Sequence, residues 1–244
     1  MLPAGTSHAM SPAMSYETLE RLRVARPVDR LAYIAGCCRG RTVLDVGCFD
    51  ETALQKRDTE HWLHGRIASV ARRVVGVDSS SRIPPEGLAS AANAVIRRGD
   101  GVDIDRALLL SEDFDVVVAG EFIEHIEAPG RFFRNMRSAF PGRELIVSTP
   151  NGAGFANVLL GLIGREAQHP DHLHVFTFKI LNTLCLRAGF ADWQIVPYRF
   201  YATEMMLASR GAKRWLVVAV ERCIRMVEWL FPLLSFGYIV RARL

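Results

Sequence analysis

Thr42-Val-Leu-Asp-Val-Gly-Cys-Phe-Asp50 is the stretch of sequence that decides the fold, together with Val74-Val-Gly-Val-Asp78 further along the chain. Both are short β-branched runs typical of buried parallel strands, and each delivers a carboxylate beside a tight turn. The two acids, Asp45 and Asp78, are 33 positions apart, as one strand-helix-strand unit requires. A glycine after the first strand lets the backbone approach a ligand, and an acid after the second can hold a ribose diol. The pattern therefore predicts a nucleotide-like cofactor.

The composition is that of an ordinary globular protein. The 244 residues can form one α/β domain with a substantial core, since 50% are hydrophobic and 23% are charged. The net charge of +4 comes mostly from arginine and forms no dense basic block, so it is weak evidence for nucleic acid or an anionic membrane as a partner, and nucleic acid is not the expected one. The five cysteines show no Cys-x-x-Cys spacing, so we expect no disulfide framework and no zinc site. A reducing cytoplasm is the expected location.

The chain is expected to form a single domain after a short arm. Residues 1–14 are rich in Met, Pro, Ala, Ser and Gly and lack the features of a secretion signal, so they are predicted to be a flexible arm. Residues 15–244 are predicted to be one domain with insertions at about 151–171 and 200–236. No pattern in these insertions identifies the substrate.

The segment from Trp215 to Val240 is the one that most resembles a membrane span. Its longest uncharged run, 229–240, is shorter than the roughly 20 apolar residues that a spanning helix needs. An apolar stripe within it follows helical spacing: Leu216, Val220, Ile224, Val227 and Phe231. Three interpretations stay open for this helix, namely docking on its own domain, contact with a second subunit in a homo-oligomer, or peripheral contact with a membrane.

Apolar runs alternate with helical segments along the chain, which predicts a Rossmann-like, doubly wound α/β sheet with inserted helical segments. Seven strands are expected, at 42–46, 73–77, 94–97, 114–120, 144–148, 191–198 and 237–242. Helices are expected at 17–37 with a break at Pro27, 58–72, 87–93, 130–140, 177–189 and 215–231.

The Asp45-x-Gly47 turn, followed by Asp78, resembles motif I and the ribose acid of class I S-adenosylmethionine (SAM) dependent methyltransferases. The first loop departs from that family's Gly-x-Gly-x-Gly, because Gly47 is followed by Cys48-Phe-Asp-Glu51. SAM carries no phosphate and needs less backbone clearance than a dinucleotide, so the departure favours SAM over NAD. The resemblance also implies that the last strand of the mostly parallel sheet runs antiparallel.

The resemblance implies a role for each part of the cofactor site, with SAM bound and S-adenosylhomocysteine released. The first loop would lie against the methionine part, the acid after the second strand would hold the ribose, and Asp100 would contact adenine. Asp100 is equally well explained as a solvated turn residue. The expected cofactor-binding residues are Asp45, Gly47, Cys48, Asp78, Ser79, Asp100, Gly101 and Glu121.

A second constellation, Glu121-Phe-Ile-Glu124-His125, follows the strand at 114–120, where α/β folds place their active crevice. If a helical turn begins here, Glu121, Glu124 and His125 project from one face at i, i+3 and i+4. Two carboxylates and an imidazole that converge would repel one another or titrate abnormally unless a cation or substrate joined them.

This Glu-x-x-Glu-His motif resembles ubiquinone-biosynthesis O-methyltransferases and small-RNA terminal 2′-O-methyltransferases, where such residues bind a divalent metal. The RNA family adds a histidine after the fifth strand, which His172 matches best. The resemblance implies an Mg²⁺ or similar site that would lower the pKa of a substrate hydroxyl. Its expected ligands are Glu121, Glu124, His125 and His172.

A metal-free interpretation stays open, in which His125 or His172 takes the hydroxyl proton as general base. The candidate catalytic residues are His125, Glu124 and His172. The neighbouring His169 and His174 are more often loop or packing residues. A further group, His61, Trp62 and His64, is expected to pack against or cap the cofactor pocket.

The leading functional hypothesis is a SAM-dependent O-methyltransferase acting on a hydroxyl of a sugar, a glycan or lipid-linked precursor, or a natural product. Nitrogen methylation is less favoured, because Gly120-Glu-Phe-Ile123 stands where such enzymes carry an Asn/Asp-Pro-Pro-aromatic motif. One alternative is an RNA 3′-end 2′-O-methyltransferase. Another is a non-catalytic SAM-binding or scaffold protein.

Overall fold

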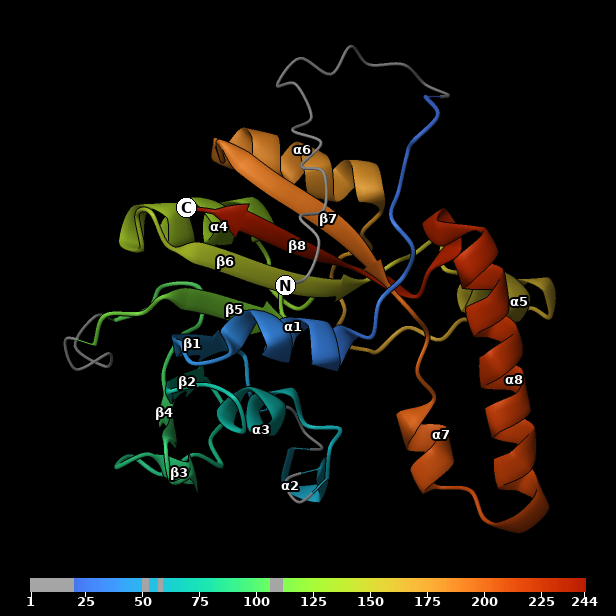
Figure 1. The fold of residues 1–244 in the computed structure, drawn as a ribbon, viewed down its shortest axis with the longest axis horizontal. Coiled ribbons are helices and arrows are strands. Elements are labelled where there is room, and N and C mark those ends of the chain that lie inside the picture. Colours follow the sequence, from blue (N-terminus) through green and yellow to red (C-terminus); the bar gives the residue numbers. More distant parts are fainter. Residues whose placement is uncertain (1–19, 50–52, 57–58, 106–111) are drawn as a thin grey trace.

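An eight-stranded sheet forms the centre of the computed structural model (Figure 1). The structure describes residues 20–49, 53–56, 59–105 and 112–244. The predicted arm, 1–14, lies outside these residues. The strand order is β3-β4-β2-β1-β5-β6-β8-β7. The strands are β1 (Thr42–Val46), β2 (Arg73–Asp78), β3 (Leu88–Ala91), β4 (Ala94–Arg98), β5 (Val116–Gly120), β6 (Glu144–Pro150), β7 (Asp192–Tyr198) and β8 (Gly237–Arg243).

The predicted α/β sheet and its antiparallel last strand are confirmed. Neighbouring strands from β4 to β6 pair in parallel, and β8 runs antiparallel between β6 and β7. The strand β1 is buried along its whole length, because helices cover both faces of the sheet. A strand that is covered on both sides is largely apolar, which is the pattern at 42–46 except for Asp45, whose buried carboxylate is bound by His64.

Helices cover the two faces of this sheet as separate layers. On one face α1 (Arg30–Cys38) packs against α3 (Leu63–Ala68), which follows the short α2 (Ala53–Lys56). On the other, α4 (Pro129–Ala139) packs against α6 (Phe178–Ala188) and buries Phe132 and Phe133. A third group stands beside the carboxyl end of β6 in Figure 1: α5 (Phe155–Leu162), α7 (Thr203–Leu207) and α8 (Gly211–Leu230).

Two secondary-structure predictions are wrong. The expected helix at 87–93 contains strand β3, which pairs antiparallel with β4 as an eighth, edge strand. Its turn is fixed by Asn93, whose side-chain amide donates to the carbonyls of Ala68 and Ala71 at 3.0 and 2.9 Å. The expected helix at 17–37 begins only at Arg30, because Val28 forms a parallel bridge with Tyr198 and so holds the preceding chain extended.

The face of α8 that packs on the domain is also not the one that the apolar stripe in the sequence predicts. Leu216, Val220 and Phe231 are exposed, whereas Glu221, Ile224 and Glu228 are buried. The two glutamates face inward because they bind the chain at 200–202. The backbone N–H of Phe200 donates to Glu228 at 2.8 Å, and that of Ala202 donates to Glu221 at 3.3 Å. In the part of the chain that the structure describes, no helix is both long and apolar enough to cross a bilayer.

Burial at this contact has a consequence for stability. Loss of water around Glu228 raises the pKa of its carboxyl from 4.5 to about 7. Because the folded pKa lies above the unfolded one, the stability linked to this group is fully present below pH 4.5. It is lost as the pH rises through 7.

We expect Glu228→Gln to stabilise the protein at pH 8, by up to about 3 kcal/mol, and to lose this advantage near pH 4.5. The neutral amide keeps an acceptor for the N–H of Phe200 without a charge to bury. Thermal unfolding at the two pH values measures the effect. Exposed Glu86→Gln is the matched control, and a melting temperature of Glu228→Gln that stays below wild type at pH 8 would contradict the argument.

Candidate functional site

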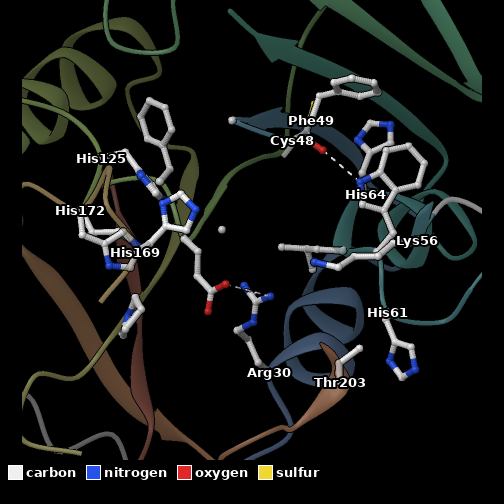
Figure 2. A pocket seen from close by; sticks show the side chains of 18 of the residues that line it. Arg30, Cys48, Phe49, Lys56, His61, His64, His125, His169, His172 and Thr203 are labelled. Atoms are coloured by element: carbon white, nitrogen blue, oxygen red, sulfur yellow. Dashed lines mark hydrogen bonds and ion pairs between the residues drawn. The ribbon is translucent and has the colours of Figure 1, made fainter. Parts of the chain in front are cut away.

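A cavity of about 1330 Å³ opens at the carboxyl ends of β1, β2 and β5 (Figure 2). At β1 the order of the strands along the chain reverses, because β2 lies on one side of it and β5 on the other. Open α/β sheets bind ligands at such a switch point. Several residues that the sequence singles out line the cavity, including Asp45, Gly47, Cys48, Asp78, Ser79, Asp100, Gly101, Glu121, Glu124, His125 and His172.

The loop after β1 depends on the missing side chain of Gly47. Its φ is 68°, and its N–H donates to the carbonyl of Val77 at 2.8 Å. A Cβ at this position would overlap the ring of Phe122. Glycine is therefore required both by backbone conformation and by the aromatic ring packed on it.

Asp78 is held with its carboxylate at the cavity wall. One oxygen accepts from the N–H of Phe49 and the other from the N–H of Ser80, both at 2.9 Å. The first bond ties the end of β2 to the loop after β1, and the second closes the turn that contains Ser79. A carboxylate oriented in this way is an acceptor of the kind that a ligand hydroxyl needs.

Asp45 is buried, and a residue of helix α3 binds its carboxylate. Its carboxylate accepts from Nδ1 of His64 at 2.9 Å, and Nε2 of His64 lies 2.8 Å from the hydroxyl of Ser90. The indole N–H of Trp62 donates to the carbonyl of Cys48 at 3.1 Å. His64 and Trp62 thus support the loop from beneath, which agrees with the packing role expected for them.

Asp100 serves as a turn residue. Its carboxylate accepts from the N–H of Val102 at 2.7 Å. The adjoining Gly101 has no room for a side chain, because a Cβ would lie 2.7 Å from Val46 and 2.8 Å from Phe122. The turn role of Asp100 is therefore seen directly, and its contact with adenine stays a prediction.

The predicted common face of Glu121, Glu124 and His125 is wrong. The chain after β5 forms irregular turns, and Glu121 has a φ of 53°, in the left-handed region that non-glycine residues rarely adopt. The carboxylate of Glu121 accepts from the phenols of Tyr198 at 2.9 Å and Tyr201 at 2.7 Å.

Arg30 completes this second cluster, which the sequence did not reveal. Its guanidinium lies 3.6 Å from the Glu121 carboxylate and donates to Ser148 at 3.2 Å. Burial, followed by the charge of Glu121, raises the pKa of Tyr198 and Tyr201 well above 10, so both phenols remain hydrogen-bond donors. The four residues come from three distant parts of the chain, at 30, 121 and 198–201, and no local pattern connects those parts.

Glu124, His125 and His172 converge on the opposite side of the cavity. They can each offer one ligand atom within 4.8 Å of the others. The loop bearing His172 is held in place by the carbonyl of Glu124, which accepts from Leu173 at 2.8 Å and His174 at 3.2 Å. In Figure 2 the imidazoles of His125, His169 and His172 gather at this side, facing Arg30 and His64 across the pocket.

Neither oxygen of the Glu124 carboxylate makes a hydrogen bond of normal geometry with the described residues, although the hydroxyl of Thr149 and the N–H of Glu124 lie near enough to oppose the rise in its pKa. Burial, with the nearby negative charge of Glu121, raises its pKa to about 8. Burial and the neighbouring His125 lower the pKa of His172, which favours the neutral imidazole. A buried carboxylate without a partner beside imidazoles is a donor set that fits a divalent cation. Glu121 is not among the three residues whose ligand atoms lie within 4.8 Å of one another, and its role as a metal ligand stays a prediction.

The other two histidines of the loop differ in position. His169 belongs to the group, with its ring centre 6.0 Å from that of His125 and 5.7 Å from that of His172. His174 turns away, with Nε2 donating to the carbonyl of Glu127 at 3.2 Å. His172 is oriented by Gln168, whose side-chain oxygen lies 3.2 Å from Nδ1. Donation from Nδ1 leaves the lone pair of Nε2 for a ligand.

Comparisons with known proteins identify the fold around this site. A family model described as a methyltransferase domain matches residues 16–195. No curated protein sequence gives a significant match. A SAM-dependent methyltransferase from Archaeoglobus fulgidus is similar in structure, with 17% identity, a TM-score of 0.52 and coverage of 88% of this chain and 91% of that one.

Two further solved structures carry other descriptions. The small RNA methyltransferase HEN1 matches with 20% identity and a TM-score of 0.54, over 93% of this chain and 27% of its own. A possible histamine N-methyltransferase from Thermotoga maritima matches with 15% identity and a TM-score of 0.54, over 87% and 86%. Such low identities establish the fold alone, and the two descriptions name different acceptors.

We expect cation binding at Glu124 to strengthen as the pH rises. The carboxyl has a pKa of about 8 and must lose its proton to bind a cation. Affinity for Mn²⁺ should therefore increase roughly twentyfold between pH 6.5 and 8.5. Calorimetry in buffers of different ionisation enthalpy would measure both the affinity and the released proton. Glu124→Gln should lose the binding, and an affinity that does not change with pH would contradict the assignment.

Proposed function

The chain belongs to the methyltransferase domain family and is a SAM-dependent methyltransferase, and from this premise we propose that it methylates a hydroxyl group with the help of a divalent cation. The acceptor proposed is a sugar, a glycan or lipid-linked precursor, or a natural product. The observation that carries the proposal is the buried, unpartnered carboxylate of Glu124 beside His125 and His172.

The edge formed by β1 and β2 suits SAM. Asp78 would accept the ribose hydroxyls, since its carboxylate is already oriented by two backbone N–H groups. The loop at Gly47 and Cys48 would lie along the methionine part, and Asp100 with Gly101 would border adenine. When bound, SAM supplies an electrophilic methyl group. The protein's own contribution is then to align an acceptor with it, which can provide most of the rate.

A divalent cation would be held by Glu124, His125 and His172, with Glu121 as a further proposed ligand. When bound, the cation supplies Lewis-acid stabilisation of a deprotonated hydroxyl. Glu124 contributes the negative charge, and the neutral His172 contributes a nitrogen lone pair. Gln168 keeps the His172 ring in one orientation. Mg²⁺ prefers oxygen ligands and the imidazoles also suit Mn²⁺, so we propose testing both ions.

Oxygen is favoured as the acceptor atom, because this side of the pocket offers two ways to remove a hydroxyl proton. One would use a cation on Glu124 to lower the pKa of the hydroxyl, so that water or a neighbouring histidine can take its proton. The other needs no metal and uses His125 or His172 as general base. The lowered pKa of His172 keeps it unprotonated and able to accept a proton. A chelator distinguishes the two mechanisms, since it would leave the second one intact.

RNA 3′-end 2′-O-methylation remains the second candidate. The fold similarity to HEN1 and the Glu-x-x-Glu-His motif favour it. Binding to a short RNA at 50 and 200 mM salt would test it, because affinity dominated by phosphate contacts falls steeply with salt. Absence of binding at both concentrations would exclude this candidate.

We expect Asp78→Ala to weaken SAM binding at least tenfold. Charge-assisted hydrogen bonds to a ribose diol are worth about 1.5–3 kcal/mol each. Calorimetry with SAM and with S-adenosylhomocysteine measures the loss. Asp192→Ala, at the exposed start of the edge strand β7, is the control and should bind normally. Wild-type affinity in Asp78→Ala would mean that the ribose lies elsewhere, and no binding by the wild type would leave only a scaffold role.

We expect Glu124→Ala to abolish methyl transfer while leaving SAM affinity within about twofold, because Glu124 lies on the acceptor side of the pocket. Transfer of a radiolabelled methyl group from SAM into separated glycan, lipid and RNA fractions would reveal both the activity and the acceptor class. Added chelator should inhibit the wild type, with recovery on Mg²⁺ or Mn²⁺. Activity that survives both the substitution and the chelator would exclude the cation.

A further inference from the structure

The helix α8 has its polarity inverted relative to an ordinary surface helix. Its buried residues are Glu221, Ile224 and Glu228. Arg225 lies between the two acids, donating to Glu221 at 2.6 Å and to the carbonyl of Phe200 at 2.8 Å. The charged groups are thus used for attachment to the domain, and the apolar residues of the helix are left to face outward.

The outward side of α8 carries many exposed apolar side chains. Trp215 is 78% exposed, Leu216 64% and Met226 61%. These three, with Val220, Trp229, Leu230 and Phe231, recur at spacings that place them on the outer half of the helix. Solitary exposed apolar side chains are common, but a patch of two tryptophans and several aliphatic residues marks a contact surface.

The neighbouring helix α5 has the same character. It packs against α8 and has no buried residue of its own. Leu162 and Ile163 at its end are 78% and 68% exposed, and Val158 and Leu159 are also exposed. We call the exposed apolar residues of α5, α8 and Phe231 the α5–α8 face. In Figure 1 these helices stand at one side of the molecule, beyond the sheet.

The charges on this face have one sign. The exposed charged residues within α8 are Lys213, Arg214 and Arg222, and both of its acids are buried. Exposed Arg210 precedes the helix, while Arg165 and Glu166 beyond α5 offset each other. Two copies paired through α8 would bring cations toward cations. An apolar surface with tryptophans and a cationic border is instead complementary to the interface of an anionic bilayer.

We propose that the α5–α8 face docks on the surface of an anionic lipid bilayer. The apolar side chains enter the headgroup region, and Lys213, Arg214 and Arg222 meet the lipid phosphates. The cavity lies behind the same helix, since Glu221 and Arg225 line it from the inner side of α8. Docking therefore places one wall of the cavity against the membrane surface.

Vesicle cosedimentation tests this surface directly. The full-length protein should bind vesicles containing 30% phosphatidylglycerol at least tenfold better than pure phosphatidylcholine vesicles, and high salt should weaken the binding. Trp215→Ser/Met226→Ser should lower binding to the anionic vesicles at least tenfold. Lys213→Glu/Arg214→Glu/Arg222→Glu should remove the preference for anionic lipid. Tryptophan fluorescence should shift to the blue when the wild type binds.

Ile180→Ser provides the matched control, because Ile180 is 44% exposed on α6, outside this face. All variants change exposed residues, so their melting temperatures should equal that of the wild type. Failure of the wild type to bind anionic vesicles would overturn the proposal, as would equal binding by Trp215→Ser/Met226→Ser. A wild-type dimer that this double variant dissociates, without vesicle binding, would assign the face to a second copy instead.

Discussion

The parallel register of β1 with β2 and β5 is the constraint on which the site depends. Asp45 pairs with Gly76 on one side and with Val118 on the other, so the three strands end at one edge. Their last residues are followed by Gly47, by the Asp78 turn and by Glu121. Parallel strands need crossover connections, which leave this edge free of hairpins. The same geometry that buries the apolar strands therefore opens the cavity at their ends.

Three glutamates, of which Glu124 and Glu228 are buried and Glu121 is partly buried, show how this protein uses charge inside the fold. Glu121 is matched by Arg30 and two phenols, and Glu228 by a backbone N–H. Glu124 has no comparable partner and has its pKa raised to about 8. Burying a carboxylate without compensation costs several kcal/mol, so such a group is usually retained for a ligand. This contrast singles out Glu124 as the residue around which the proposed chemistry is built.

The local sequence pattern was sufficient to predict the strands and the edge of the sheet at which the cavity opens. The apolar runs placed β1, β2 and β5 within two residues of their observed bounds, because burial on both faces demands such runs. The pattern failed in two places. Residues 88–91 pair with the adjacent strand β4 in a hairpin, whose turn residue Asn93 is bound by the distant carbonyls of Ala68 and Ala71. Glu121 is bound by phenols some 80 positions later in the chain, which leave no signal near it.

The sequence by itself determined the class of fold, the two strand-end acids and the presence of acids and histidines at the end of β5, because these follow from the order of apolar and polar residues along a strand. Tertiary structure brings the expected His172 to Glu124 and His125, and it alone decided that two phenols bind Glu121 and that α8 turns its glutamates inward. Each depends on a hydrogen bond to a chain segment far away in sequence. Such bonds are satisfied only once the whole sheet has brought the segments together.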